Sequence, residues 1–311
     1  MNVQTVAIPR VGGSTRPAWA QKWLSGETRV AWLFILPSLV GFVLFYAVPA
    51  VRGVAISFTN WDLLRPPQFV GTDNYQRLIT DGEFWQSLLV TTYYVLLNIP
   101  VQTFLALGLA VMMDRLTKSV LLRGVLILPW LMPNVVVALI WLWMLDPSLG
   151  VVNQILGVFG IPRQPFLGSP SEAMPAIAWM NIWRHMGYTA LLFFAGLQTI
   201  PQSVYEAAAI DGANELRTFW SITLPLLRPV MVFVMVTTVV GSFQIFDTIA
   251  VTTKGGPVNA TKVVNWYIYD FAFSRFQMGY ATTLAMALFA ILIVATLLQM
   301  RYLRAGQSDL A

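Results

Sequence analysis

Residues 30–51 decide the fold class of this 311-residue chain and read VAWLFILPSLVGFVLFYAVPAV. These 22 residues lie between Arg29 and Arg52 and include no charged side chain. A helix rises about 1.5 Å per residue, so a helix of this length crosses the roughly 30 Å hydrocarbon layer of a bilayer. The stretch is therefore predicted to span a membrane.

Five further apolar runs of comparable length follow along the chain. They cover residues 84–113, 124–145, 174–197, 229–246 and 276–300. Over the whole chain 57% of residues are hydrophobic and 11% are charged, whereas about a quarter are charged in an average soluble protein. The sequence thus predicts an all-α polytopic membrane protein with six transmembrane helices. The expected domains are a tail over 1–29, a transmembrane domain over 30–302 and a tail over 303–311.

The basic residues indicate an orientation. Eleven Lys and Arg residues lie on the side that holds both tails and the loops 114–123 and 198–228, against seven on the other side. By the positive-inside rule, both termini and these two loops are cytoplasmic. The apolar run after the basic N-terminal tail is too long for a signal peptide, so we expect the tail to be retained.

The composition argues against several kinds of chemistry. The chain has no Cys and one His, which leaves no thiolate metal site, no Cys nucleophile and few acid, base or metal-ligand constellations. The basic residues are scattered between apolar runs and form no patch for nucleic acid. We therefore predict no catalytic residue, no metal site and no nucleic-acid partner.

The most informative motif is YEAAAIDGANELR, at residues 205–217. Residues 206–210 favour a short helix, with Glu206 expected in its first turn, where the helix dipole favours an acid, and Gly212 expected to end it. Three small side chains would let another protein approach closely: Ala207, Ala208 and Ala209. A short exposed helix between two spans suits docking into a partner's groove. An ordinary interfacial loop helix is the alternative.

This motif resembles the EAA loop of the inner-membrane permease subunits of binding-protein-dependent ABC importers. The matching residues are Glu206-Ala207-Ala208, Asp211-Gly212-Ala213, and Ile222 with Leu224-Pro225. Other blocks are similar to the sugar importers, and among them to the maltose-type first permease: Phe69-Val-Gly71, Leu128-Pro-Trp130, Gly196-Leu-Gln198, Gly241-Ser-Phe-Gln244 and Gly255-Gly-Pro257. The resemblance covers roughly residues 30–302.

The resemblance implies a type I ABC-importer permease fold in a bacterial or archaeal inner membrane. The loop at about 198–228 would hold a coupling helix in a cleft of a cytoplasmic ATPase. Its contact residues would be Glu206, Ala207, Ala208, Asp211 and Gly212. The implied partners are a second permease, a dimer of ATPase subunits, an extracytoplasmic solute-binding protein and membrane lipid.

This chain is not expected to be an enzyme. A phosphate-binding P-loop needs a Gly-Lys pair before its Ser or Thr, and the chain has no Gly-Lys dipeptide. ATP and magnesium would therefore be bound by the partner ATPase, and no cofactor is expected in this chain.

Four polar side chains share one face of the predicted fourth span, at i, i+3, i+4 and i+7: Asn181, Arg184, His185 and Tyr188. An Arg at the bilayer centre costs about 2.5–3.5 kcal/mol, so such residues usually face a cavity and mark a pathway. The family resemblance adds Gln244 to this predicted substrate pathway. Alternatively, Arg184 snorkels outward or pairs with Asp247, and His185 bonds a backbone carbonyl.

The function implied by the resemblance is translocation of a mono- or oligosaccharide, energised by the separate ATPase. The cationic Arg184 leaves glycerol 3-phosphate or a related phosphorylated polyol as an alternative cargo. An ion-coupled secondary transporter is a further alternative, although no inverted repeat is obvious. A structural or receptor-like membrane subunit that moves no solute is another.

Overall fold

The computed structural model describes residues 26–115 and 119–302, and side chains from residue 30 onward. The described residues form helices and loops, with one isolated β-bridge between Thr59 and Phe69. The predicted all-α class is confirmed. The chain divides into two units, residues 1–55 and 56–311.

The first unit is one long apolar helix. It consists of α2 (Gly26–Phe42), the π-helical turn η1 (Val43–Ala47) and α3 (Val48–Ser57), which continues into the second unit. Hydrophobic side chains such as Leu33, Phe34 and Phe45 are exposed along it. A helix that is apolar on its exposed faces suits lipid or partner helices rather than water.

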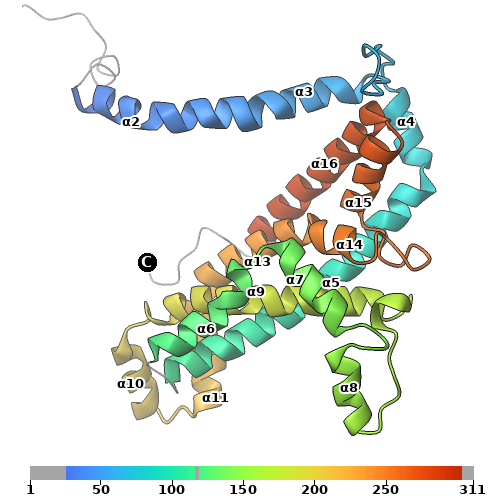
Figure 1. Ribbon diagram of the computed structural model, residues 1–311. Helices are drawn as coiled ribbons and strands as arrows, with labels where there is room; N and C mark the ends of the chain where they lie inside the picture. The colour runs from blue at the N-terminus through green and yellow to red at the C-terminus, as the bar shows by residue number, and fades with distance from the viewer. Residues whose placement is uncertain (1–25, 116–118, 303–311) are drawn as a thin grey trace, which may run out of the picture. The chain divides into compact units, whose positions relative to one another are not determined.

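The second unit is built on three long helices: α5 (Gly82–Arg115), α9 (Ala173–Leu197) and α13 (Arg228–Phe243). Helix α5 packs along α9, and α13 packs against both (Figure 1). Ala106 and Ala110 of α5 and Ala190 of α9 are fully buried. Small residues at these positions let the helix backbones approach closely, which stabilises packing in a membrane.

Helices α6 (Val120–Leu131) and α7 (Asn134–Met144) are bent by 93° relative to each other. The bend occurs at Met132-Pro133 because proline lacks a backbone donor and disfavours helical geometry in the residue before it. The single span predicted over 124–145 is therefore broken. Helix α6 crosses α9 at Gly187, where an added Cβ would lie 1.8 Å from the Leu126 carbonyl oxygen.

In the described part of the chain, four helical segments are long and apolar enough to cross a membrane. They are Val30–Ser57, Gly82–Arg115, Arg228–Val251 and Met278–Tyr302, and the bent α6–α7 pair would make a fifth. Helix α9 has 25 residues, but Asn181, Arg184 and His185 lower its hydropathy. The count of six spans, the cytoplasmic termini and the domain boundaries stay predictions, and the tails 1–25 and 303–311 lie outside the described residues.

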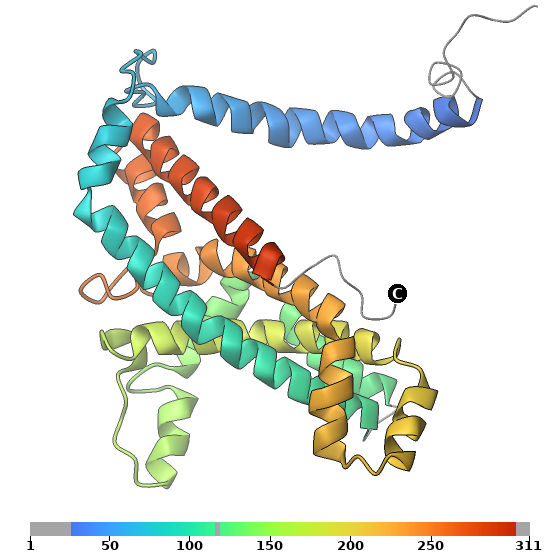
Figure 2. The ribbon, with the colours of Figure 1, turned by 180° about the vertical axis from the view of Figure 1, so that it is seen from behind.

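Shorter elements occupy the connections. Between α7 and α9 lie α8 (Val151–Val158) and the turn η2 (Phe166–Gly168). Between α9 and α13 lie α10 (Gln202–Ile210), α11 (Glu215–Thr218), η3 (Phe219–Thr223) and α12 (Leu224–Leu226). Figure 2 shows α8 and α10 at opposite ends of α9.

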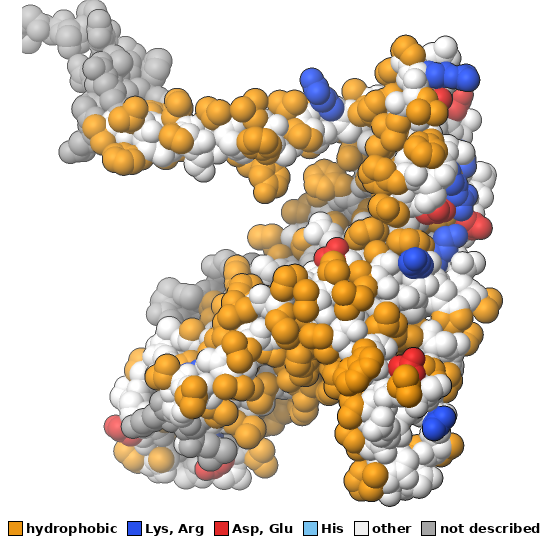
Figure 3. Space-filling view, viewed as in Figure 1, with side chains coloured by type: hydrophobic (Ala, Val, Ile, Leu, Met, Phe, Trp, Pro, Cys, Tyr) orange, Lys and Arg blue, Asp and Glu red, His pale blue; other side chains and the backbone are white. Residues whose placement is uncertain are grey.

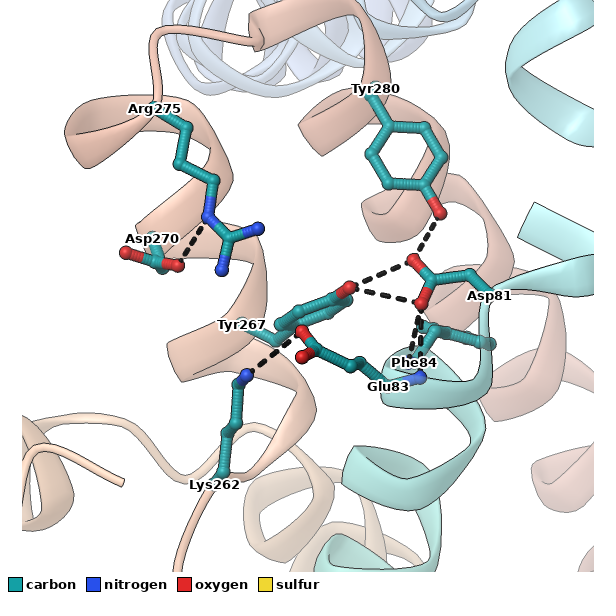
Figure 4. Close-up of polar contacts among 8 residues, drawn as sticks. All are labelled: Asp81, Glu83, Phe84, Lys262, Tyr267, Asp270, Arg275 and Tyr280. Carbon is teal, nitrogen blue, oxygen red and sulfur yellow. Dashed lines mark hydrogen bonds and ion pairs between the residues drawn. The ribbon is translucent and has the colours of Figure 1, made fainter. Parts of the chain in front are cut away.

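The C-terminal elements are α14 (Asp247–Val251), α15 (Val264–Tyr269), η4 (Asp270–Ser274) and α16 (Met278–Tyr302). A polar and aromatic cluster joins the start of α5 to α15 and α16. In Figure 4 the Asp81 carboxylate accepts hydrogen bonds from the Tyr267 and Tyr280 hydroxyls. It also caps α5, since it accepts from the backbone N–H groups of Glu83 at 3.0 Å and Phe84 at 3.2 Å. Helix α4 (Asp73–Thr80) precedes this cluster and packs on α16.

The contacts of this cluster also shift the pKa of Asp81. Burial acts to raise the pKa of this carboxyl, but the hydrogen bonds from Tyr280 and Tyr267 and from the α5 backbone outweigh burial and lower the pKa below 3.8. Beside it, the Lys262 ammonium lies 3.1 Å from a Glu83 oxygen. These contacts tie α5, α15 and α16 together at one end of the second unit.

Candidate functional site

A cavity of about 400 Å³ lies among α5, α6, α7, α9, α13 and α14. Its wall is predominantly polar and aromatic. The polar and aromatic lining residues are Tyr94, Asn98, Gln102, Trp130, Asn134, Asn181, His185, Tyr188, Thr189, Thr237, Thr238, Ser242, Gln244, Phe246, Asp247 and Thr248. Four of the five predicted pathway residues are therefore brought together here, namely Asn181, His185, Tyr188 and Gln244.

Arg184, the fifth, is not among the lining residues. Its Nε donates to the Met132 carbonyl at 3.1 Å, and its Nη2 donates to the carbonyls of Trp130 at 3.1 Å and Met132 at 2.9 Å. Helix ends leave carbonyls without intrahelical partners, and a cation there is favourable. Arg184 thus braces the end of α6 at the α6–α7 bend.

His185 is held as a neutral ring by two hydrogen bonds. Its Nε2 lies 2.7 Å from Nη1 of Arg184, and its Nδ1 lies 2.8 Å from the Asn181 carbonyl. A guanidinium only donates, so Nε2 accepts and the ring proton resides on Nδ1, which donates to the carbonyl. The contact with the Asn181 carbonyl matches the alternative expectation that His185 bonds a backbone carbonyl.

An aromatic pair forms part of the wall. The rings of Trp130 and Tyr188 stack with centroids 4.4 Å apart and an angle of 8° between their planes. The spacing of polar residues along α9 predicted that Tyr188 lies on the same helix face as His185. No sequence pattern indicated Trp130 at the cavity, because its position depends on where α6 ends.

A buried polar network from α5 faces α9 and α13. Asn98 Nδ2 donates to the Ser242 hydroxyl at 3.1 Å, and Gln102 Nε2 donates to the Thr189 hydroxyl at 3.0 Å. Asn98 Oδ1 is buried and has no hydrogen-bond partner within the described residues. A buried acceptor without a partner costs free energy, and this one lies on a residue that lines the cavity.

Asp247 supplies an acidic group to the lining. Asn134 Nδ2 donates to Asp247 Oδ2 at 2.8 Å, and Asn134 Oδ1 has no partner among the described residues. No direct ion pair between Asp247 and Arg184 occurs in the described part of the chain. Asp247 is the one acidic side chain among the described lining residues, and none of them is a Lys or Arg.

At the other end of α9, helix α10 begins earlier than its sequence motif indicates. Pro201 precedes its first residue, Gln202, and no acidic residue lies in its first turn. The prediction of Glu206 in the first turn is wrong, because Pro201 starts the helix and leaves Glu206 in the second turn. Gly212 ends the helix as predicted, with a φ of +75°. The N–H of Ala213 bonds the carbonyl of Ala208 at 2.9 Å, which completes a glycine C-cap.

Four of the five predicted coupling residues are exposed on this loop: Glu206, Ala207, Asp211 and Gly212. Ala208 is 4% exposed and packs toward its own chain. Three large hydrophobic side chains are exposed around them: Ile210, Leu216 and Trp220. An ion pair of 2.7 Å from Arg115 to Glu215 anchors the loop to α5. Figure 3 shows acidic and hydrophobic side chains together at this end.

The described residues hold no cluster of His, Asp and Glu that could bind a metal ion. The candidate functional site comprises two separate features. One is a cavity that offers hydrogen bonds and aromatic faces. The other is an exposed loop of mixed acidic and apolar character.

A protein-family model described as "Binding-protein-dependent transport system inner membrane component" matches residues 102–305. The chain is 33% identical over 283 residues to the trehalose/maltose transport system permease protein MalF of Thermococcus litoralis, which covers 90% of this chain and 95% of that protein. It is 32% identical over 295 residues to the sn-glycerol-3-phosphate transport system permease protein UgpA of Shigella flexneri, covering 93% and 97% of the two chains.

A solved structure has a similar fold. It is the crystal structure of a bacterial alginate ABC transporter in complex with an alginate pentasaccharide-bound periplasmic protein. A chain of that structure matches with a TM-score of 0.79 and 23% identity, covering 92% of this chain and 99% of that chain.

Proposed function

The chain belongs to the family of binding-protein-dependent inner-membrane transport components, the permease subunits of ABC importers, and we propose that it carries a neutral sugar through the cavity between α5, α9 and α13. Its relatives include permeases of trehalose/maltose and sn-glycerol-3-phosphate transport systems, and the ATPase of such importers is a separate subunit. The observation that carries the proposal is the cavity lining, which combines amides, hydroxyls and aromatic rings.

The lining chemistry suits a polyhydroxylated solute. Amide and hydroxyl groups such as those of Asn98, Gln244 and Thr238 donate to and accept from sugar hydroxyls. Aromatic faces such as that of Tyr188 pack against the apolar face of a sugar ring. Asn98 Oδ1, which has no partner within the described part of the chain, gives the wall an acceptor that a solute hydroxyl can satisfy.

The charge of the lining favours a neutral sugar over glycerol 3-phosphate. Arg184, which suggested an anionic cargo, directs its N–H groups to the carbonyls of Trp130 and Met132 and to His185. The lining instead includes the Asp247 carboxyl group. A phosphate beside a carboxylate in a site of low dielectric is destabilised by charge repulsion.

ATP-driven movement of the ATPase would be transmitted to the cavity through α10. In this proposal Glu206, Ala207, Asp211 and Gly212 contact an ATPase subunit, whereas Ala208 supports the helix from within. The exposed Ile210 and Leu216 add apolar area to that contact, as expected of an interface with a hydrophobic centre and a polar rim. Because α10 directly follows α9, movement of α10 would be transmitted to the cavity wall.

The complete importer would contain this chain, a second permease, an ATPase dimer and an extracytoplasmic solute-binding protein in a bacterial or archaeal inner membrane. A loaded binding protein docks on the side of the cavity opposite α10. ATP-driven closure of the ATPase dimer pulls α10 and opens the cavity outward. Hydrolysis returns the cavity to its inward-facing state.

The test is uptake by the complete importer in proteoliposomes, using the solute recovered from the cognate binding protein. We expect a neutral sugar, ATP-dependent uptake, and loss of uptake when Gln244 is replaced by Leu. A phosphorylated solute would contradict the choice of cargo. Uptake without the ATPase, driven by an ion gradient, would contradict the mode of energy supply.

A double variant tests the coupling contact separately. Glu206→Lys with Gly212→Pro should leave the chain inserted in the membrane and abolish uptake, because the first reverses a surface charge and the second removes the helix end. Thr237→Ala, a cavity substitution away from α10, is the control and should retain ATPase activity. Normal uptake by the double variant would refute the coupling assignment.

A further inference from the structure

Helix α8 and its flanking loop, residues 146–164, lie at the opposite end of α9 from α10 (Figures 1 and 2). The segment connects α7 to α9. In both views α8 lies apart from α9, transverse to it, and projects from the bundle. The proposed cavity and coupling contact make no use of it.

Of the two polar side chains of α8, Asn153 points inward, whereas Gln154 is exposed and its Nε2 donates to the Leu149 carbonyl at 3.0 Å. Asn153 is 5% exposed, and its Nδ2 donates to the carbonyl of Gln164 at 2.9 Å and to the carbonyls of Asp146 and Pro147 at 3.4 Å. Its Oδ1 accepts from the N–H of Gln164 at 2.9 Å. This amide therefore closes the loop by satisfying backbone groups on its inner side.

Several large apolar side chains of the same segment point outward, whereas Val152 packs against the buried cluster around Trp141. Val158 is 83% exposed and Phe159 is 75% exposed. Leu149, Ile155 and Ile161 are exposed as well. A small helix in water normally buries such residues, whereas this segment leaves them exposed and buries Asn153.

Charge is confined to the two ends of this segment, at Asp146 and Arg163. Residues 147–162 contain no charged side chain, and Arg163 follows them directly. Figure 3 shows hydrophobic and uncharged atoms over α8. By contrast, the apolar residues near α10 alternate with Glu206, Asp211 and Glu215. The two ends of α9 thus present surfaces of different chemistry.

We propose that α8 lies in the lipid interface of the membrane, with Val158, Phe159 and Ile155 inserted among acyl chains. An in-plane helix places its apolar face about 5–10 Å below the headgroup boundary. Arg163, at the edge of the uncharged stretch, is exposed and positioned to reach lipid phosphates. A soluble partner would instead be expected to meet a surface with a polar rim.

The absence of native cysteine allows a direct test with single-cysteine variants. Val158→Cys is compared with Val258→Cys, which replaces another valine, 88% exposed, on the polar loop after α14. Each single-cysteine chain is labelled with bimane before it is assembled into the complete importer, which is then reconstituted in phosphatidylglycerol and phosphatidylethanolamine vesicles. Phe159→Cys provides a second reporter from the same face.

At position 158 we expect emission at shorter wavelength than at 258, loss of quenching by aqueous iodide, and quenching by doxyl-labelled lipid. Position 258 should show the reverse. Iodide quenching at 158 and 159 equal to that at 258 would show that the face lies in water. Protection of 158 and 159 from both quenchers would show a protein cover, and either result would overturn the proposal. None of these readings depends on the identity of the transported solute.

Discussion

Replacing Arg184 by Gln separates a structural role at the α6–α7 bend from a role in cargo binding. The guanidinium bonds the carbonyls of Trp130 and Met132, at the end of α6. A glutamine side chain at this position would be too short and would carry too few donors to reach both. The substitution should therefore leave backbone carbonyls without hydrogen-bond donors beside the break made by Pro133.

The magnitude follows from the two carbonyls. Hydrogen bonds between membrane helices contribute on average about 0.6 kcal/mol each, with a maximum near 1.7 kcal/mol. Loss of two such carbonyl contacts should lower the free energy of unfolding by about 1–3 kcal/mol on the same scale. The neutral ring of His185 also loses the donor to its Nε2, which places the value toward the upper part of that range.

The assay is equilibrium unfolding of the permease in mixed micelles, together with uptake kinetics in the complete importer. Gln244→Ala is the matched control, because Gln244 lines the cavity but does not brace the bend. We expect Arg184→Gln to lose stability with an unchanged KM for cargo, and Gln244→Ala to raise KM with unchanged stability. An Arg184→Gln variant of normal stability with a raised KM would refute the reasoning.

Three further predictions concern other contacts. Gly187→Val should destabilise the α6–α9 crossing by about 1–3 kcal/mol through overpacking, since a Cβ there meets the Leu126 carbonyl. Equilibrium unfolding in micelles measures this loss of stability. Gly108→Val is the control, because the space around Gly108 is open. Stability contributed by Asp81 should be present above its unfolded pKa of 3.8 and decline as the pH falls through its lower folded value. Asp81→Asn should flatten that acid limb of the unfolding profile. Leu216→Lys should weaken capture of the ATPase dimer by the reconstituted permease pair without changing permease stability, because its side chain is exposed.

Sequence patterns predicted the features that depend on local spacing. The interval from Asn181 to Tyr188 indicated one polar helix face, and three of its four residues line the cavity. Gly212 ends α10 because a left-handed residue is needed there and glycine adopts it readily. These features require only the geometry of a single helix.

Features that depend on how segments meet could not be predicted in the same way. Arg184 shares a face with His185 and Tyr188, but its side chain reaches the end of α6, whose position is set by the break at Pro133. Asn98 and Gln102 on α5 are single polar residues in a long apolar run, and only the packing of α5 against α9 and α13 shows their role. A residue pattern on one helix does not show which groups of another helix will contact it.

The start of α10 gives a further example. Four helix-favouring residues after Glu206 suggested where the helix lies, whereas Pro201 sets its first residue through its fixed backbone angle. The exposure of Ala207 and the burial of Ala208 follow from the packing of α10 on its own chain. Composition alone makes these two alanines equivalent.

The most direct test of the central claim is an electron cryo-microscopy map of the complete importer trapped with cargo from its binding protein. We predict density for a neutral sugar between α5, α9 and α13, in contact with Tyr188, Asn98 and Gln244, while Arg184 still bonds the end of α6. Density for a phosphorylated solute held by Arg184, or for cargo outside this cavity, would contradict the account.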